Sequence, residues 1–285
     1  MGYLLPPVAC ALVFCGIALA YQAQPYGMLP HAERGAGRNV RGGGAHRLPA
    51  AGRGETAPVY YAAPWTEANC DEYARPLLTA LGEDFDAMEA ERSEYRVDYT
   101  DPVNHSSLQV LFLGGFCAFY QNQSGATEPA PATASREEVL QKLRSLGIPL
   151  PDQADFSTEA GAYCFTADGV EDGVLYQGQV TCTYREDGQI LSLSDELVAV
   201  PQSGEVSICP PEKAVEQVCD GKFLDTDGRL SAGRSVEEGG VVRSDIDTLT
   251  IQSITLAYLR DTKDYYQPVY AVKTDKGILY TLATQ

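Results

Sequence analysis

Histidine and cysteine are the residues of this chain whose chemistry could support catalysis or metal binding. The chain has three histidines, and His31 and His46 fall in a Gly- and Arg-rich stretch with little apolar content. A metal site or general base built from two imidazoles needs both side chains in folded structure, so this chemistry is not predicted. His105, in "DPVNHSS", remains as the candidate general base of a hydrolase, but no G-x-S-x-G nucleophile motif accompanies it.

The cysteines after the N-terminal apolar run are even in number, which permits disulfides in an exported chain. They are Cys70, Cys117, Cys164, Cys182, Cys209 and Cys219. None forms a C-x-x-C pair, which argues against a zinc or thioredoxin-like site. If strands 161–167 and 174–184 form a hairpin centred on Gly173, Cys164 faces Cys182. These two residues then form either a disulfide or a pair of small buried apolar side chains.

The remaining motifs are weak. "DTDGRLSAGRSVEEGG" (225–240) begins like a calcium loop, but Arg229 interrupts the ligand spacing, which favours a simple Asp-Gly turn. Asn104 and Asn122 head N-x-S sequons, which matter only if the host glycosylates exported proteins. We therefore predict no catalytic residue, no cofactor and no metal ligand.

The charge distribution limits the classes of partner. The net charge is −18, and residues 21–62 are net basic, so the rest of the chain is still more acidic than the total. An acidic surface repels phosphates, so we predict no nucleic-acid binding.

The first 20 residues, "MGYLLPPVACALVFCGIALA", carry no charge. They can form a transmembrane anchor, a signal peptide cleaved after Ala20, or a buried helix. Residues 21–62 are predicted to be a disordered tether rich in Gly, Ala and Arg. The resulting localisation is the cell membrane, single-pass with an extracytoplasmic C-terminal domain, with secretion as the alternative.

The elements that would position these residues begin after the tether. Residues 66–81 are predicted as a helix ended by Gly82, and residues 93–101 and 106–121 as strands. These form an N-terminal α+β segment, 63–121, followed by a Pro/Ala/Thr-rich linker, 122–134.

A helix followed by an antiparallel meander is then predicted twice. In the first unit, 135–205, Ser135 and Glu138 form a capping box, and strands 161–167, 174–184 and 189–200 follow. In the second, 206–285, a helix over 210–221 precedes strands 249–259, 267–274 and 277–283. The predicted fold class is α+β, with two tandem helix-plus-meander units. The last strands are predicted to offer a tyrosine contact surface comprising Tyr258, Tyr265, Tyr266 and Tyr270.

The second unit, "PPEKAVEQVCDGKF" followed by "IQSITLAYL" and "YYQPVYAVKTDKGILYT", resembles the YycH/YycI-type regulatory proteins and the related PepSY-like modules. The resemblance covers about residues 135–285. It implies a single-pass protein whose extracytoplasmic domain restrains a membrane sensor histidine kinase of a two-component system, without enzymatic activity.

The expected function is therefore that of a non-catalytic, membrane-tethered regulatory or binding protein that works by contact between a sheet face or edge and a protein partner. The alternative is a secreted PepSY-like protease inhibitor or propeptide-type module. A hydrolase would require a nucleophile paired with His105.

Overall fold

The computed structural model describes residues 39–42, 55–112, 115–124, 128–219, 223–225, 248–261, 263–275 and 277–284. The chain divides into two units, Met1–Gly37 and Arg38–Gln285, and every described residue belongs to the second. The predicted anchor (1–20), most of the predicted tether, and the calcium-like loop beyond Asp225 lie outside the described residues. Within these residues, no helix has the length and apolar character needed to cross a bilayer.

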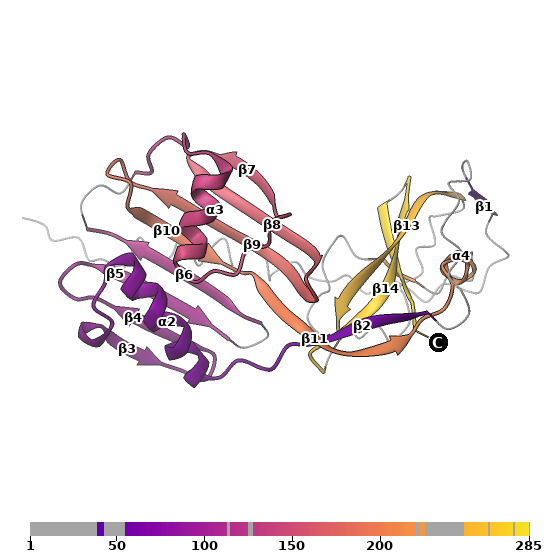
Figure 1. Cartoon of the computed structure of the whole chain (residues 1–285), viewed down its shortest axis with the longest axis horizontal. Helices are drawn as coiled ribbons and strands as arrows, with labels where there is room; N and C mark the ends of the chain where they lie inside the picture. Colours follow the sequence, from indigo (N-terminus) through magenta and orange to yellow (C-terminus); the bar gives the residue numbers. More distant parts are fainter. Residues whose placement is uncertain are drawn as a thin grey trace, which may run out of the picture. The chain divides into compact units, whose positions relative to one another are not determined.

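Strands outnumber helices along the described chain (Figure 1). In chain order the elements are β1 (Asn39–Gly42), β2 (Thr56–Tyr61), α2 (Glu67–Leu81), the 3-10 turn η1 (Phe85–Ala87), β3 (Glu89–Arg92), β4 (Arg96–Thr100), β5 (Ser106–Leu111), β6 (Cys117–Asn122), α3 (Arg136–Ser145), β7 (Asp155–Glu159), β8 (Ala162–Glu171), β9 (Val174–Tyr184), β10 (Ile190–Asp195), β11 (Val198–Ser207), α4 (Glu212–Cys219), β12 (Leu224–Asp225), β13 (Thr248–Arg260), β14 (Tyr265–Thr274) and β15 (Gly277–Leu282).

The predicted fold class is wrong, because the strands do not close into two tandem helix-plus-meander units. The structure is mainly antiparallel β-sheet, and one hydrogen-bonded path runs β1-β13-β14-β2-β11-β9-β10-β6-β5-β4-β3. Strand β10 pairs with β6 across the predicted linker. Strand β11 pairs with β9 through Val198–Pro201 and then with β2 through Gln202–Ser207. Strands from segments that were predicted to be separate therefore pair with one another. Local periodicity predicts where a strand lies but not which strand it pairs with.

Several local predictions also need correction. The predicted strand 106–121 is the hairpin β5–β6, and the predicted strand 189–200 is interrupted between β10 and β11. The end of the predicted disordered tether is strand β2, where Tyr60 is fully buried. The capping box at Ser135 and Glu138 is confirmed, because each reaches the other's backbone N–H.

Helix α2 also follows the prediction. It begins after Thr66 and ends at Gly82, whose φ of +89° is a left-handed conformation that glycine adopts without strain. Pro76 lies inside the helix without ending it.

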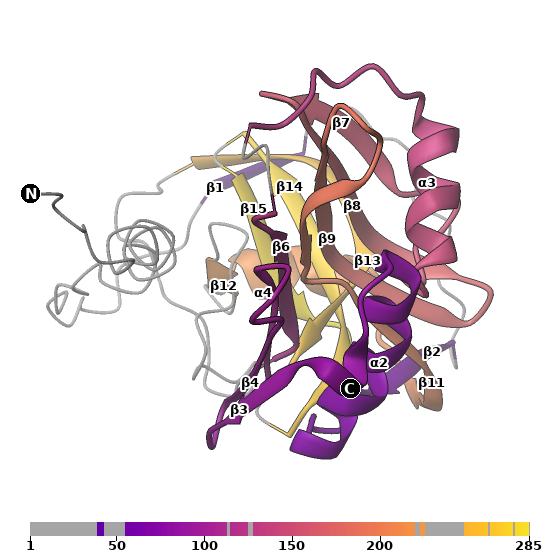
Figure 2. The same ribbon diagram turned by 90° about the vertical axis from the view of Figure 1, so that its left-hand side faces the viewer.

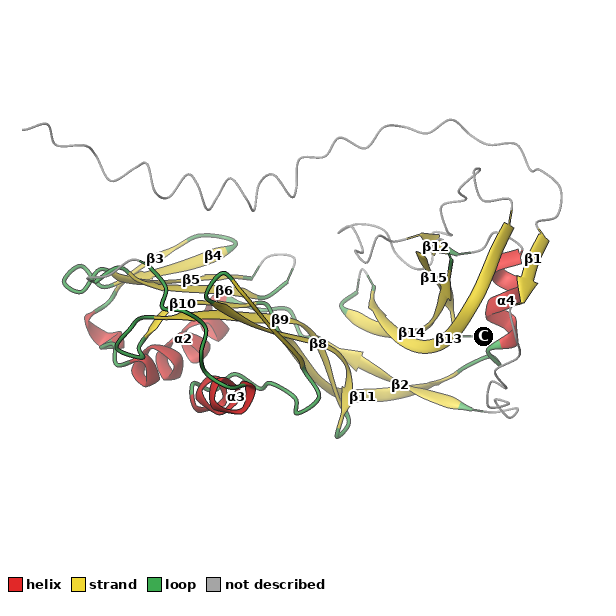
Figure 3. Cartoon of the chain, turned by 90° about the horizontal axis from the view of Figure 1, so that it is seen from above, coloured by secondary structure: helices red, strands yellow, loops and turns green. Residues whose placement is uncertain are grey.

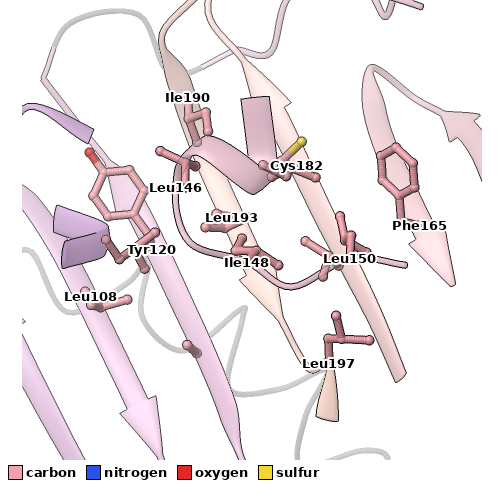
Figure 4. Close-up of a cluster of buried hydrophobic side chains, with 14 of the residues drawn as sticks. Leu108, Tyr120, Leu146, Ile148, Leu150, Phe165, Cys182, Ile190, Leu193 and Leu197 are labelled. Carbon is pink, nitrogen blue, oxygen red and sulfur yellow. The ribbon is translucent and has the colours of Figure 1, made fainter. Parts of the chain in front are cut away.

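Helices α2 and α3 lie on the same face of the sheet formed by β3–β10 (Figures 2 and 3). Their apolar sides form one large core with that face, including Leu77, Leu143 and Phe165. Figure 4 shows Leu146, Ile148 and Leu150, which follow α3, close to Leu193 of β10. The opposite face of this sheet has no helix over it among the described elements.

A second core lies between α4 and strands β13–β15. Ala214 and Val218 of α4 pack with Tyr270, Val272 and Leu279, and Ile254 of β13 packs against this group at its margin. The amphipathic helix thus covers one face of the C-terminal strands.

Candidate functional site

The residues predicted to carry chemistry are dispersed in the structure. His105 is exposed in the turn between β4 and β5, with a φ of +58°, and its N–H donates to the Asp101 carbonyl. The Asp101 carboxylate accepts hydrogen bonds from the Val103 and Asn104 backbone N–H groups, which makes this a hydrogen-bonded turn. Among the described residues, no group of three or more His, Cys, Asp or Glu side chains is arranged to hold a metal ion.

The predicted pairing of Cys164 with Cys182 is wrong by one residue. Strands β8 and β9 do form a hairpin, but Cys164 pairs with Thr181, and Cys182 pairs with Tyr163. Directly opposed residues share a face and neighbours alternate, so the two cysteines lie on opposite faces of the sheet. Both are free thiols: Cys182 is fully buried in the core and Cys164 is partly exposed.

Burial keeps several thiols in the protonated, weakly nucleophilic form. It raises the pKa of Cys117 and of Cys182 to about 12, and that of Cys70 to about 11. Since the thiolate is the nucleophile, these three cysteines are poor candidates for covalent catalysis at neutral pH.

The predicted tyrosine surface is largely core. Tyr258, Tyr266 and Tyr270 are buried, and Tyr265 alone of the four is exposed, at 38%. Tyr258 contacts the ring of Tyr60 edge-on, with centroids 5.0 Å apart. The register places the three buried tyrosines on one face of the β13–β14 pair, and the predicted contact surface is therefore mostly a face that the fold covers.

Sequence analysis missed a buried acidic group at the end of β10. Asp195 is 2% exposed, and its Oδ2 accepts a hydrogen bond of 2.8 Å from the Tyr73 hydroxyl of α2. Its Oδ1 accepts one of 3.0 Å from the Leu197 N–H. Burial raises the pKa of Asp195 to about 6, with Glu196 adding a smaller upward contribution.

Aromatic side chains pack against the ring of Tyr73. Trp65 stacks on Phe116 with centroids 4.2 Å apart, and Phe116 meets Tyr73 edge-on at 4.9 Å. The two stacked rings leave no room for a ligand between them, and both oxygens of Asp195 have partners. We therefore assign this cluster a structural role, in which a hydrogen bond and aromatic contacts hold α2 on the sheet.

The candidate functional site is the outer edge of β13. Strand β14 pairs with β13 along Ile251–Arg260, whereas β1 pairs with it only along Thr248–Ile251, in parallel. Within the described part of the chain, Ser253–Leu259 therefore has a strand partner on one side only. Because N–H and C=O groups point alternately to the two sides of a strand, every second residue directs its pair away from β14. At the end of this stretch the Tyr258 carbonyl accepts a hydrogen bond of 2.9 Å from the Gln177 side chain of β9.

The side chains of this edge strengthen the case for binding. "QSITLAYL" (252–259) contains no charge, proline or glycine. Leu256 is 40% exposed on the same face as its buried neighbour in β14, Tyr270, so the second core is open at the β13 side.

Two other edge strands, β3 and β7, are protected in ways that β13 is not. Strand β3 has the sequence "EAER", all exposed, and pairs only with β4. Strand β7, "DFSTE", has an acid at each end and pairs only with β8. Charged, short edge strands resist pairing with other chains. Compared with these two strands, the edge of β13 is longer and carries no charge along Ser253–Leu259.

Comparison with known proteins gives distant structural likeness and nothing closer. No protein-family model matches the chain, and no curated protein sequence matches it. An uncharacterized protein from Eubacterium rectale ATCC 33656 is 14% identical, with 77% of each chain covered and a TM-score of 0.44. The Bacillus megaterium YpeB C-terminal domain is 13% identical, with 79% of this chain and 95% of that chain covered and a TM-score of 0.33. The latter belongs to a PepSY-containing family, and no relationship to YycH/YycI-type proteins is shown.

Proposed function

We propose that this chain is a non-catalytic binding protein that captures an extended segment of a protein partner along the outer edge of β13. The observation that carries the proposal is the uncharged edge Ser253–Ala257, whose only strand partner among the described residues is β14. The edge ends at Tyr258, whose carbonyl accepts a hydrogen bond from Gln177 of β9. An extended segment added there gains backbone hydrogen bonds, and its alternate side chains confer selectivity.

The exposed part of the second core supplies the apolar contribution. Leu256 is 40% exposed, whereas Val272 and Tyr270 beside it in β14 are buried. A strand docked on β13 places every second side chain on this face, next to Leu256 and the half-buried Ile254. We therefore expect the bound segment to carry apolar residues at alternate positions.

The finer role follows from the family resemblance of residues 135–285. By that resemblance, we propose that the chain is a membrane-tethered, extracytoplasmic PepSY-like regulator whose partner is a sensor histidine kinase. Capture of a strand of the kinase would then shift the kinase between its signalling states. The alternative is a secreted inhibitor or propeptide-type module whose captured segment belongs to a protease. Recovery of an intact N-terminus in the membrane fraction supports the tethered form, whereas a soluble product that begins at Tyr21 supports the secreted one.

Site-specific photocrosslinking in the native host tests the docking surface. The full chain is produced with p-benzoylphenylalanine in place of Leu256, and in a matched control in place of Ile278, which is 41% exposed on β15. We expect an adduct from position 256 only, and mass spectrometry should place its partner peptide in an extended segment. Equal adducts from both positions, or adducts from position 278 alone, would contradict the proposal.

A charged substitution at the edge of β13 is the second test of the docking surface. Leu256→Lys adds the charged residue that open edges ordinarily carry, so it should abolish crosslinking from a second probe placed at Thr255. Ile278→Lys should leave that crosslink intact. Both variants should retain the thermal midpoint of the parent within a few degrees, which separates loss of binding from loss of folding.

A further inference from the structure

The open stretch of β13 has a defined end at Tyr258. The side-chain Nε2 of Gln177, in β9, donates a hydrogen bond of 2.9 Å to the Tyr258 carbonyl. Tyr258 lies opposite Pro268 of β14, which has no N–H to donate, and the Pro268 carbonyl accepts from the Ala283 N–H. Tyr258 and Pro268 are therefore a non-hydrogen-bonded pair of the antiparallel ladder, and the backbone groups of Tyr258 point away from β14.

This pair fixes which backbone groups of the stretch face outward. In an antiparallel ladder the N–H and C=O of one residue point to the same side, and the side alternates from residue to residue. The register between β13 and β14 is regular from Ser253 onward. Counting back from Tyr258, both Leu256 and Ile254 direct their N–H and C=O away from β14. The open edge thus offers two donors and two acceptors to an incoming strand.

The other end of the stretch is bounded by strand β1. It pairs with Thr248–Ile251, and the register of β13 with β14 shifts between Ile251 and Ser253. Ser253–Ala257 is therefore a slot of five residues between two described partners, β1 and Gln177. Five residues of extended chain span about 17 Å.

The side chains beside these outward groups share one face. Ile254 lies opposite Val272, and Leu256 lies opposite Tyr270. Val272 and Tyr270 belong to the second core, whereas Leu256 is 40% exposed. Residues directly opposed in an antiparallel pair place their side chains on the same face, so two residues of an added strand, two positions apart, contact Ile254 and Leu256.

We propose that this slot captures, antiparallel to β13, a short segment with apolar residues at positions i and i+2, and that Gln177 sets the end of the slot. The inference rests on the proposed function and specifies its ligand. Antiparallel addition is the economical arrangement, because two residues of the segment then bond all four outward groups of Ile254 and Leu256, and parallel ladders are slightly less stable. The segment leaves the edge at both ends, so it is a short strand bounded by turns or a chain end.

Gln177 ends the slot because its side-chain amide replaces a backbone amide. The amide donates to the Tyr258 carbonyl, as the next N–H of a captured strand would. An amide NH2 group has two donors, and the same Nε2 also donates to Asp168 Oδ1 at 3.3 Å, which holds the side chain in place. A captured strand therefore stops short of Tyr258 unless Gln177 is removed.

NMR titration of the full isotope-labelled chain with capped peptides tests the apolar spacing. The first probe is Thr-Val-Thr-Val-Thr, and the matched control, Val-Thr-Thr-Val-Thr, has the same composition with its valines three positions apart and so on opposite faces. We expect the first peptide to shift the amide signals of Ile254 and Leu256 and to bind about tenfold more tightly than the control, because the control loses one apolar contact.

A nine-residue Thr-Val repeat tests the length of the slot. In the parent it should bind no more than about threefold more tightly than the five-residue repeat, which is the statistical factor of its three registers. Gln177→Ala frees the Tyr258 carbonyl, so it should raise the affinity for the nine-residue peptide about fivefold and leave that for the five-residue peptide unchanged. Gln179→Ala, at an exposed position of the same strand, is the matched control and should change neither.

Equal binding of the two five-residue peptides would overturn the inference, as would the same affinities in Gln177→Ala and Gln179→Ala. Absence of any response of the Ile254 and Leu256 amides to both peptides would also overturn it. The proposed function stands through these outcomes if photocrosslinking at position 256 still yields an adduct that position 278 does not. Loss of that difference is the separate failure of the proposed function.

Discussion

The Tyr73 hydroxyl donates a 2.8 Å hydrogen bond to the Asp195 carboxylate, which joins helix α2 to the end of strand β10. Asp195 is 2% exposed, so this contact places an ionisable group in the main core. The protonation state of Asp195 is therefore expected to affect the stability of the contact between α2 and β10.

The first prediction concerns this acid. Burial raises the pKa of Asp195 in the folded chain to about 6, above the ordinary value of 3.8. Its contribution to stability is thus fully present below pH 4 and is lost as the pH rises through 6. Asp195→Asn imitates the protonated acid and does not titrate. The difference in unfolding free energy, variant minus parent, should therefore increase by about 2 to 3 kcal/mol from pH 4 to pH 7.5.

Denaturant unfolding of both proteins at the two pH values measures that difference. Tyr73, Cys117 and Glu196 are the other titratable groups that interact with Asp195, and all remain in the variant, so the comparison isolates the one carboxyl. If Asp195→Asn leaves the pH dependence of the parent unchanged, Asp195 is ionised in the fold at no cost.

The second prediction concerns a close backbone approach. Gly178 of β9 has a φ of +119°, and a Cβ at this position would lie 2.1 Å from the Glu196 carbonyl oxygen. Gly178→Ala should lower the unfolding free energy by about 3 kcal/mol or more, because both the conformation and the contact are unfavourable. Gly188→Ala, with a φ of +81° and nothing within 4 Å, should lose only about 1 kcal/mol. Equal losses would show that the approach to Glu196 does not constrain this part of β9.

The third prediction concerns the two cysteines of the β8–β9 hairpin. Cys164 is partly exposed and Cys182 is buried on the other face of the sheet. Iodoacetamide should therefore modify Cys164 in the folded chain and Cys182 only after unfolding, as read by peptide mass spectrometry. A Cys164–Cys182 disulfide in non-reduced peptides would contradict the register.

Short-range signals in the sequence predicted the elements well. The capping box of Ser135 and Glu138 and the terminal Gly82 mark helices that the structure contains. The Asp-Gly turn also predicted the β8–β9 hairpin. Both Asp172 and Gly173 have positive φ, so the hairpin centre falls between them rather than on Gly173. This half-residue difference moved Cys164 one position away from Cys182.

Long-range pairing could not be predicted in the same way. Nothing local in "LSLSD" indicates that β10 pairs with β6, or that Asp195 meets Tyr73 across 122 residues. The tyrosines show the same limit, because Tyr270 was predicted to belong to a contact surface yet packs with Ala214 and Val218 of α4. The uncharged run of β13 was visible in the sequence, but its unpaired side depends on which strands lie beside it.

The most direct measurement of the central claim is residue-resolved amide hydrogen exchange along Ser253–Leu259 of the isolated chain. If the outer edge of β13 is available for strand capture, every second amide, directed away from β14, exchanges rapidly while the alternate amides are protected. Addition of the crosslinked partner should then protect both sets. Uniform slow exchange along this stretch in the isolated chain would contradict the account, because it would mean that the edge is already paired.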